Sequence, residues 1–124
     1  MRQGLLQRSF DHVIKQGKPS MNHNRGVCRY KNEEGLSCAA AIFITKYDED
    51  MEGSSWEELA RFIPDLLEEG AVKESNFVYK VIQRPHDIAS RHTDFIPAYK
   101  RALVNAIDEW NFKHQDNIRP PEGF

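Results

Sequence analysis

One apolar stripe near the end of the chain restricts the fold more than any other pattern in the sequence. Between residues 93 and 112, apolar side chains recur every three or four positions, which predicts a long amphipathic helix that buries one face. Thr93 precedes this helix, and Pro97 falls in its first turn, where proline is tolerated. The stripe consists of Phe95, Tyr99, Ala102, Leu103, Ala106, Ile107 and Trp110.

The first sixteen residues predict a second amphipathic helix. We expect it over residues 3–16, because apolar side chains share one face there and Gly17 follows as a stop signal, with Pro19 just beyond. The segment 18–26 is polar and has the composition of a loop. The apolar positions of the helix are Leu6, Phe10, Val13 and Ile14.

Shorter helices are expected in the middle of the chain. The segment Ser54–Glu58 contains two overlapping capping boxes, which mark the start of a helix over 56–62. Proline cannot lie inside a helix without a kink, so a separate helix is expected to begin near Pro64 and to end at Gly70.

A further helix is expected to begin at Ser75, whose hydroxyl can cap it. Pro85 lies inside the same apolar pattern and is expected to bend or break the helix. The inner positions of this pattern are Phe77, Val78, Val81, Ile82, Ile88 and Ala89.

The segment 27–44 has the strongest strand character in the chain. VCRY (27–30) and SCAAAIFI (37–44) flank a Gly-containing turn, which predicts a β-hairpin with Gly35 at a positive φ. Three consecutive alanines favour helix, whereas the β-branched and aromatic residues after them favour strand. A short helix after Cys38 is therefore an alternative to the second arm.

The length of 124 residues fits one domain. We expect a single compact, mostly helical α+β domain over residues 1–112 with a small β-hairpin, and an irregular C-terminal tail over 113–124. The longest apolar run, Ala39–Ile44, is far shorter than the ~18 residues of a membrane span. The N-terminal segment lacks the pattern of a signal peptide. These features favour a cytoplasmic protein with reduced thiols.

Charge is distributed unevenly along the chain. Residues 1–46 carry 8 Lys/Arg and 3 Asp/Glu, whereas residues 47–76 carry 2 Lys/Arg and 10 Asp/Glu. The formal net charge of the whole chain is −2. A strongly acidic segment can hold a basic partner and repels nucleic acid, although a solvated helix face has the same composition.

One set of short motifs consists of Cys28-x-Tyr30, Gly35-x-x-Cys38-Ala39, Ile44, Tyr47, Met51-Glu52-Gly53, Ile82-Gln83 and His86-Asp87. Together these motifs resemble a family of small phage and prophage proteins. The resemblance covers the chain from about Phe10 to Trp110, and this family has no assigned activity. It implies a phage setting and a host-directed inhibitor, such as a counter-defence protein. The chain departs from the family pattern at Ala40 or Ala41, where a glycine often follows the cysteine, and at Pro85.

The first functional hypothesis is a non-enzymatic interaction protein that binds a host or partner protein through an acidic surface. The partner could itself bind nucleic acid, and no direct contact of this chain with nucleic acid or membrane is expected. Trp56 is either an exposed interface anchor or a core tryptophan. The predicted surface comprises Asp48, Asp50, Glu52, Trp56, Glu57 and Glu58.

The alternative hypothesis is a small-ligand or nucleotide-binding protein, or a small hydrolase with a cysteine nucleophile and His86 as its base. No glycine-rich phosphate-binding motif is present to strengthen the nucleotide reading. The residues of this alternative site are Cys28, Tyr30, Cys38, Tyr47, Glu52, His86 and Asp87.

No metal or cofactor is predicted from the sequence. The two cysteines are ten residues apart and lack the close spacing typical of zinc ligands, even if His86 approaches them. The acidic run Asp48–Gly53 begins like a calcium-binding loop, but Leu59 stands where that loop requires a bidentate glutamate.

Overall fold

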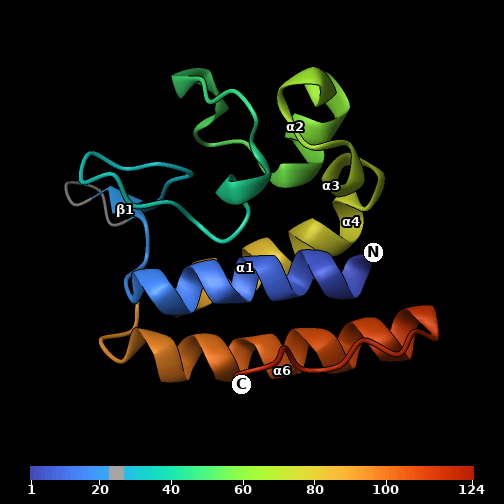
Figure 1. The fold of residues 1–124 in the computed structure, drawn as a ribbon. Coiled ribbons are helices and arrows are strands. Elements are labelled where there is room, and N and C mark those ends of the chain that lie inside the picture. Colours follow the sequence, from blue (N-terminus) through green and yellow to red (C-terminus); the bar gives the residue numbers. More distant parts are fainter. Residues whose placement is uncertain (23–26) are drawn as a thin grey trace.

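Two long antiparallel helices form the base of the molecule (Figure 1). The computed structural model describes residues 1–22 and 27–124, and the base consists of α1 (Arg2–Gln16) and α6 (Phe95–His114). Phe10 of α1 stacks on Tyr99 of α6 with ring centroids 6.2 Å apart. Both predicted helices are confirmed, and α1 ends at Gly17 with a left-handed φ of 74°.

A third helical run packs against both long helices and lies behind α1 in Figure 1. It is continuous from Ser75 to Ala89 and comprises α4 (Ser75–Phe77), the π-helix η4 (Val78–Gln83) and α5 (Arg84–Ala89). The expected break at Pro85 is absent from this run. Proline lacks an N–H and its ring crowds the preceding turn, and the wider π turn accommodates both effects.

The π turn also explains one error in the predicted buried face. The N–H of Arg84 donates to the carbonyl of Tyr79, five residues back, so the helix contains more residues per turn here. Side chains after this turn therefore point in directions that differ by about 100°, the step of one residue, from those in an unbroken α-helix. Ile88, predicted to face inward, is consequently 55% exposed, whereas His86 is fully buried.

An irregular layer of short helices covers the top of the three helical runs (Figure 1). It contains η1 (Ala41–Phe43), η2 (Glu49–Met51), α2 (Trp56–Phe62), η3 (Pro64–Leu66) and α3 (Glu69–Lys73). The predicted helix over 56–62 is confirmed, together with the capping box between Ser55 and Glu58.

The helix expected from Pro64 to Gly70 is wrong. Only one 3₁₀ turn follows the proline, and the chain then becomes extended at Leu67. Here the backbone pairs with the segment after η1: the N–H of Glu68 donates to the carbonyl of Phe43, and that of Thr45 to the carbonyl of Leu66. These long-range hydrogen bonds replace the local helical ones.

The expectation of an α+β fold with a β-hairpin is also wrong, and the protein is helical. In the part of the chain that the structure describes, the paired strands are β1 (Met21–Asn22) and β2 (Val27–Cys28), each two residues long. Between the predicted hairpin arms, only the isolated bridge of Lys31 with Ser37 has β pairing.

Side-chain hydrogen bonds and small residues explain why the hairpin does not form. The side-chain oxygen of Asn32 accepts the N–H groups of Glu34 and Leu36, which closes a compact turn. The alanines at 39–41 are buried, and the hydroxyl of Ser9 donates to the carbonyl of Ala39 at 2.8 Å. A strand with one exposed face is incompatible with this close approach to α1. The short helix considered as an alternative exists as η1.

The segment 115–124 contains no helix or strand and returns along α1. The N–H of Arg119 donates to the side chain of Gln3, and Phe124 stacks on Phe10 with centroids 5.9 Å apart. α6 itself extends to His114, two residues beyond the expected end of the domain. None of the helices in residues 1–22 and 27–124 has the length and apolar character needed to cross a membrane.

One buried amide joins the irregular layer to the helices below. Gln83 of η4 accepts the N–H of Trp56 at 2.9 Å and donates to the hydroxyl of Tyr30 at 2.8 Å. The same hydroxyl donates to the carbonyl of Ser54 at 2.6 Å. Gln83 therefore connects η4 both to the start of α2 and to the loop at Tyr30, and the Tyr30 hydroxyl extends this network to Ser54.

Gln83→Met should destabilise the protein by about 2–4 kcal/mol, because it leaves the buried N–H of Trp56 without an acceptor and removes the donor to Tyr30. Urea unfolding followed by circular dichroism measures this change. Gln115→Met is the matched control, since within the described residues its exposed amide bonds only the carbonyl of Phe112. Equal midpoints for the two variants would contradict the proposed role of Gln83.

Candidate functional site

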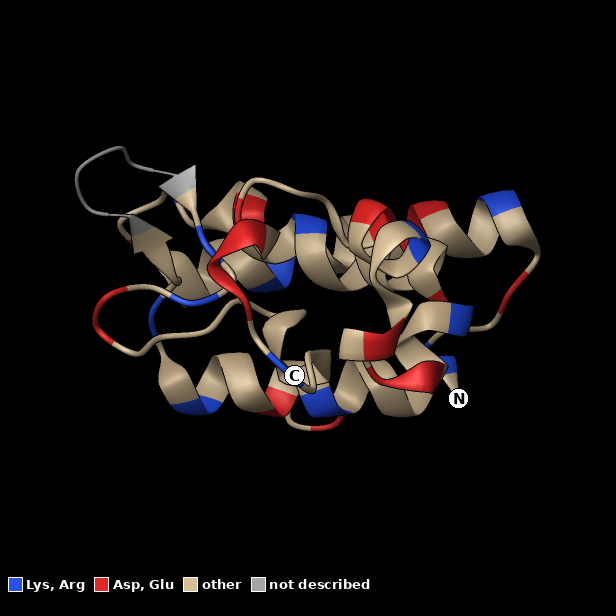
Figure 2. Ribbon diagram, turned by 90° about the horizontal axis from the view of Figure 1, so that it is seen from above, with Lys and Arg blue, Asp and Glu red and all other residues tan. Residues whose placement is uncertain are grey.

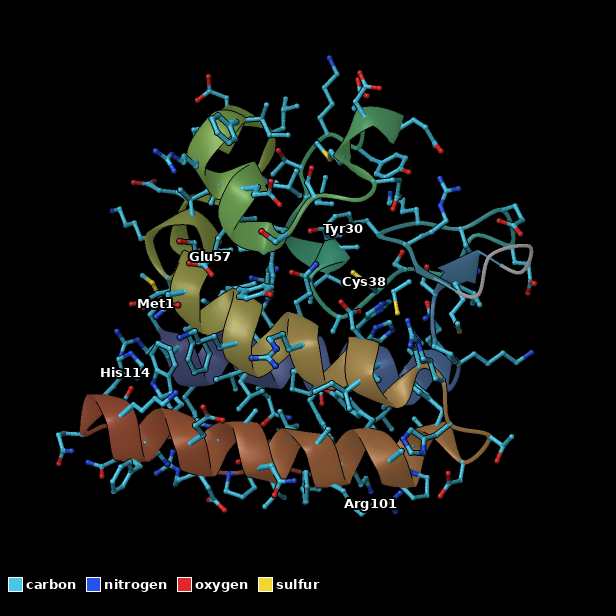
Figure 3. All side chains as sticks on the ribbon, turned by 180° about the vertical axis from the view of Figure 1, so that it is seen from behind. Met1, Tyr30, Cys38, Glu57, Arg101 and His114 are labelled. Atoms are coloured by element: carbon cyan, nitrogen blue, oxygen red, sulfur yellow. The ribbon has the colours of Figure 1, made fainter. Side chains whose placement is uncertain are left out.

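A cleft of about 560 Å³ lies between the loop that carries the cysteines, the turn before α2 and the helical run from η4 to α5. Figure 3 shows Tyr30 and Cys38 close together above this helical run. The lining residues are Cys28, Arg29, Tyr30, Cys38, Glu52, Gly53, Ser54, Ser55, Tyr79, Gln83, Asp87, Ile88 and Arg91.

The structure brings together the residues of the alternative site. Five of the seven line the cleft directly. Tyr47 reaches the same region through a 2.5 Å hydrogen bond from its hydroxyl to Glu52. His86 is fully buried beside Asp87, with 3.1 Å between Nδ1 and the nearer carboxylate oxygen.

Glu52 acts as a structural clamp within this site. Its carboxylate accepts the backbone N–H groups of Tyr30 at 2.8 Å and Lys31 at 3.1 Å, as well as the Tyr47 hydroxyl. It also lies 3.8 Å from the guanidinium of Arg29. Because both carboxylate oxygens already accept these hydrogen bonds, Glu52 is poorly placed to act as a general base.

The two cysteines are free thiols in an environment that favours their protonated form. Burial, and then the negative charge of Asp87, raise the pKa of Cys28 to about 12. Burial likewise raises the pKa of Cys38. A thiol must ionise to act as a nucleophile, so this geometry does not favour the hydrolase hypothesis.

Cys28, His86 and Asp87 form a compact group at the cleft. One potential ligand atom from each lies within 4.8 Å of the others. The Cys28 thiol donates to the hydroxyl of Ser90 at 2.9 Å, and Ser90 donates to the carbonyl of Asp87 at 2.6 Å. The sequence analysis considered both cysteines and His86 as metal ligands and did not predict a site; in the structure Cys38 is outside this group and Asp87 belongs to it.

The predicted acidic surface is only partly available. Five of the ten acidic residues in 47–76 form ion pairs, and three of those bases lie in the N-terminal segment 1–46. Glu49 and Glu52 pair with Arg29, Glu68 with Arg8, Glu74 with Arg2, and Glu69 with Lys73. The charge asymmetry of the sequence is therefore used in part to hold the fold together.

The other five acidic residues have no ion-pair partner among the described residues: Asp48, Asp50, Glu57, Glu58 and Asp65. Three of them border a second, smaller cleft of about 300 Å³ beside η2, α2 and η3. We name this cleft the acidic groove. Its lining residues are Asp48, Asp50, Met51, Ser54, Glu58, Leu59, Phe62, Ile63 and Leu66. Figure 2 shows acidic positions distributed over this upper layer.

Trp56 lies in the core and cannot anchor an interface. It is fully buried, and its indole N–H donates to the carbonyl of Ala71 at 3.0 Å. Phe62, which the sequence analysis missed, is 71% exposed at the end of α2. It lies six positions after Trp56, or about 240° around a helix, so the periodicity of α2 already separates Phe62 from the buried side.

No protein-family model matches the chain, and neither a curated protein nor a solved structure matches it. The assignment of function therefore depends on the geometry of the two clefts.

Glu52→Gln should destabilise the protein by about 1–3 kcal/mol, since an amide can accept at only one of its two ends and the clamp uses both oxygens. Thermal and urea unfolding measure the effect. Glu49→Gln is the matched control, because Glu49 also pairs with Arg29 but its side chain is 72% exposed. A Glu52→Gln protein as stable as this control would show that the clamp is not structural.

Proposed function

We propose that this protein binds a basic segment of a partner protein, with an apolar side chain of that segment held in the acidic groove. The exposed ring of Phe62 beside carboxylates that have no ion-pair partner in the described part of the chain is the observation that carries this proposal. The proposal keeps the interaction hypothesis from the sequence and replaces its anchor, Trp56, by Phe62.

The charge of this surface supports a basic partner. Asp48, Asp50 and Glu58 border the groove, and Glu57 and Asp65 lie exposed on the neighbouring helices. Arg61 is the one base of α2, and its guanidinium lies 5.6 Å from the centroid of the Phe62 ring. A surface with this excess of carboxylates attracts Lys and Arg side chains and repels phosphates.

The apolar part of the groove supports a protein partner rather than free cations. Leu59, Ile63 and Leu66 line the groove with Phe62, and Met51 is buried beneath it. Exposed aromatic side chains next to apolar pockets are frequent energetic centres of protein interfaces. A partner segment that alternates apolar and basic residues satisfies both parts of the groove.

The proposed setting is the cytoplasm of a bacterial host. The resemblance to phage and prophage proteins supports this setting, and a host-directed inhibitor, such as a counter-defence protein, is the role that it implies. A host protein that binds nucleic acid is a suitable partner class, because such proteins expose basic segments.

Phe62→Ser should weaken binding of an amphipathic Lys/Leu peptide by about tenfold, or 1.4 kcal/mol, because it removes the aromatic contact. Fluorescence anisotropy of the labelled peptide measures the dissociation constant. Phe112→Ser is the matched control, since Phe112 is 80% exposed on α6, away from the groove. The proposal fails if the wild-type protein does not bind this peptide, or if both variants bind it equally.

Charge reversal at Asp50 and Glu57 should weaken binding of the same peptide and reduce its dependence on salt, because rim charges act mainly through screened long-range attraction. The side chains of Asp50 and Glu57 make no hydrogen bond within the described residues, so Asp50→Lys/Glu57→Lys should leave the fold intact. Asp108→Lys, on exposed α6 surface, is the control. An unchanged salt dependence in the double variant would contradict the electrostatic part of the proposal.

A further inference from the structure

The geometry points to a transition-metal site formed by Cys28, His86 and Asp87 at the larger cleft. One ligand atom from each side chain lies within 4.8 Å of the other two. The three residues come from β2 and α5, which the fold brings together from distant parts of the sequence. None of them belongs to the acidic groove, so this inference goes beyond the proposed function and does not depend on it.

His86 is the buried imidazole of this group. Its side chain is fully buried, and Nδ1 lies 3.1 Å from the nearer carboxylate oxygen of Asp87. An ion shared by His86 and Asp87 therefore lies on the Nδ1 side of the ring, and Nδ1 is the ligand atom. Nε2, on the other side of the ring, has no hydrogen-bond partner within residues 1–22 and 27–124 and carries the proton of the neutral imidazole when the ion is bound.

The surroundings of His86 hold its ring in place. The edge of Phe95 packs against it, with centroids 5.5 Å apart and an interplanar angle of 78°. Phe95 begins α6, which packs extensively on α5. The imidazole is therefore presented to the group in a restricted orientation, as metal ligands usually are.

The chemistry of the donors selects the class of ion. A thiolate, an imidazole and a carboxylate are the usual ligands of Zn²⁺ and of Co²⁺ as its substitute. Ca²⁺ and Mg²⁺ prefer all-oxygen sites and are poorly matched to this group. With bond lengths of about 2.0–2.3 Å, the ligand atoms around tetrahedral zinc lie about 3.3–3.8 Å apart, so the side chains would close by roughly 1 Å.

Three protein ligands leave one coordination position for water or for an atom of a bound molecule. Cys28 and Asp87 both line the cleft, so this fourth position has access to solvent. An ion can enter by the same route. The site therefore has the ligand number of an open zinc centre rather than of a closed structural one.

Metal binding changes the protonation of one group. The Cys28 sulfur forms a bond to the ion, its S–H bond breaks, and one proton passes to the solvent. The hydrogen bond from the thiol to Ser90 is lost, and Ser90 retains its own donation to the carbonyl of Asp87. His86 binds through Nδ1 as a neutral base, with its ring proton on Nε2, and Asp87 binds as an anion, so one proton is released for each ion bound.

The test uses the full chain, reduced and freed of metal by chelation, titrated with Co²⁺ and followed by absorption spectroscopy. We expect one Co²⁺ per chain, a sulfur-to-cobalt charge-transfer band in the near ultraviolet and the intense visible bands of a tetrahedral ion. Zn²⁺ should abolish these bands by displacement and should raise the thermal unfolding midpoint.

Variants distinguish the site from adventitious binding. Cys28→Ser should abolish the charge-transfer band, and Asp87→Asn should weaken Co²⁺ binding at least tenfold while circular dichroism remains that of the wild type. Cys38→Ala is the matched control, because Cys38 lines the same cleft but is outside the group, and it should retain the band. His92→Ala, at an exposed histidine close in sequence to α5, should also leave binding unchanged.

Three results would overturn the inference. These are the absence of a cobalt spectrum at millimolar Co²⁺, a charge-transfer band that persists in Cys28→Ser, and equal loss of the band in Cys38→Ala. None of them bears on the acidic groove, whose peptide binding is measured without metal.

Discussion

The buried side chain of Gln83 is the interaction on which the arrangement of both clefts depends. Its oxygen accepts the first N–H of α2, and its nitrogen donates to the Tyr30 hydroxyl, so the amide joins two separate parts of the irregular layer to the helical run below. The helices of the irregular layer are short, from three to seven residues each. Side-chain bonds to buried groups therefore take the place that a sheet would occupy in an α+β domain.

Charge plays two different roles on this molecule. Half of the acidic residues in 47–76 form ion pairs, mostly with bases in residues 1–46. Two of these pairs connect α1 to the two ends of α3: Arg8 binds Glu68 before this helix, and Arg2 binds Glu74 after it. The acids without an ion-pair partner among the described residues lie on or next to η2, α2 and η3, and three of the five border the acidic groove. A net charge of −2 gives no indication of this division.

Local signals in the sequence predicted the elements that local interactions form. The stripe of α6, the glycine stop of α1 and the capping box of α2 are each complete within one turn or one helix face, and all three are confirmed. The hairpin and the helix after Pro64 were predicted wrongly because distant partners decide their structure. Ser9 binds Ala39 from another helix, and Phe43 takes the N–H of Glu68.

The predictions for the site divide in the same way between what the local sequence indicates and what contacts with distant residues decide. The sequence singled out the cysteines, Tyr30, Glu52 and His86. In the structure the first four line one cleft, and His86 is buried beside Asp87, which also lines it. The role of each residue depends on which groups its side-chain atoms contact, and the sequence alone does not give these contacts. Glu52 is occupied by backbone N–H groups, whereas Nε2 of His86 is buried without a partner among the described residues.

The π turn before Pro85 has a consequence for how this chain tolerates changes in length. A π turn is equivalent to an α-helix with one inserted residue, so deleting one residue between 78 and 83 would restore ordinary helical spacing. Four residues of an α-helix turn through about the same angle as five residues of a π turn, so the side chains after the deletion would keep their orientation. His86 would then stay in the core and Ile88 at the surface. The segment can therefore lose one residue without changing which face of α5 is buried.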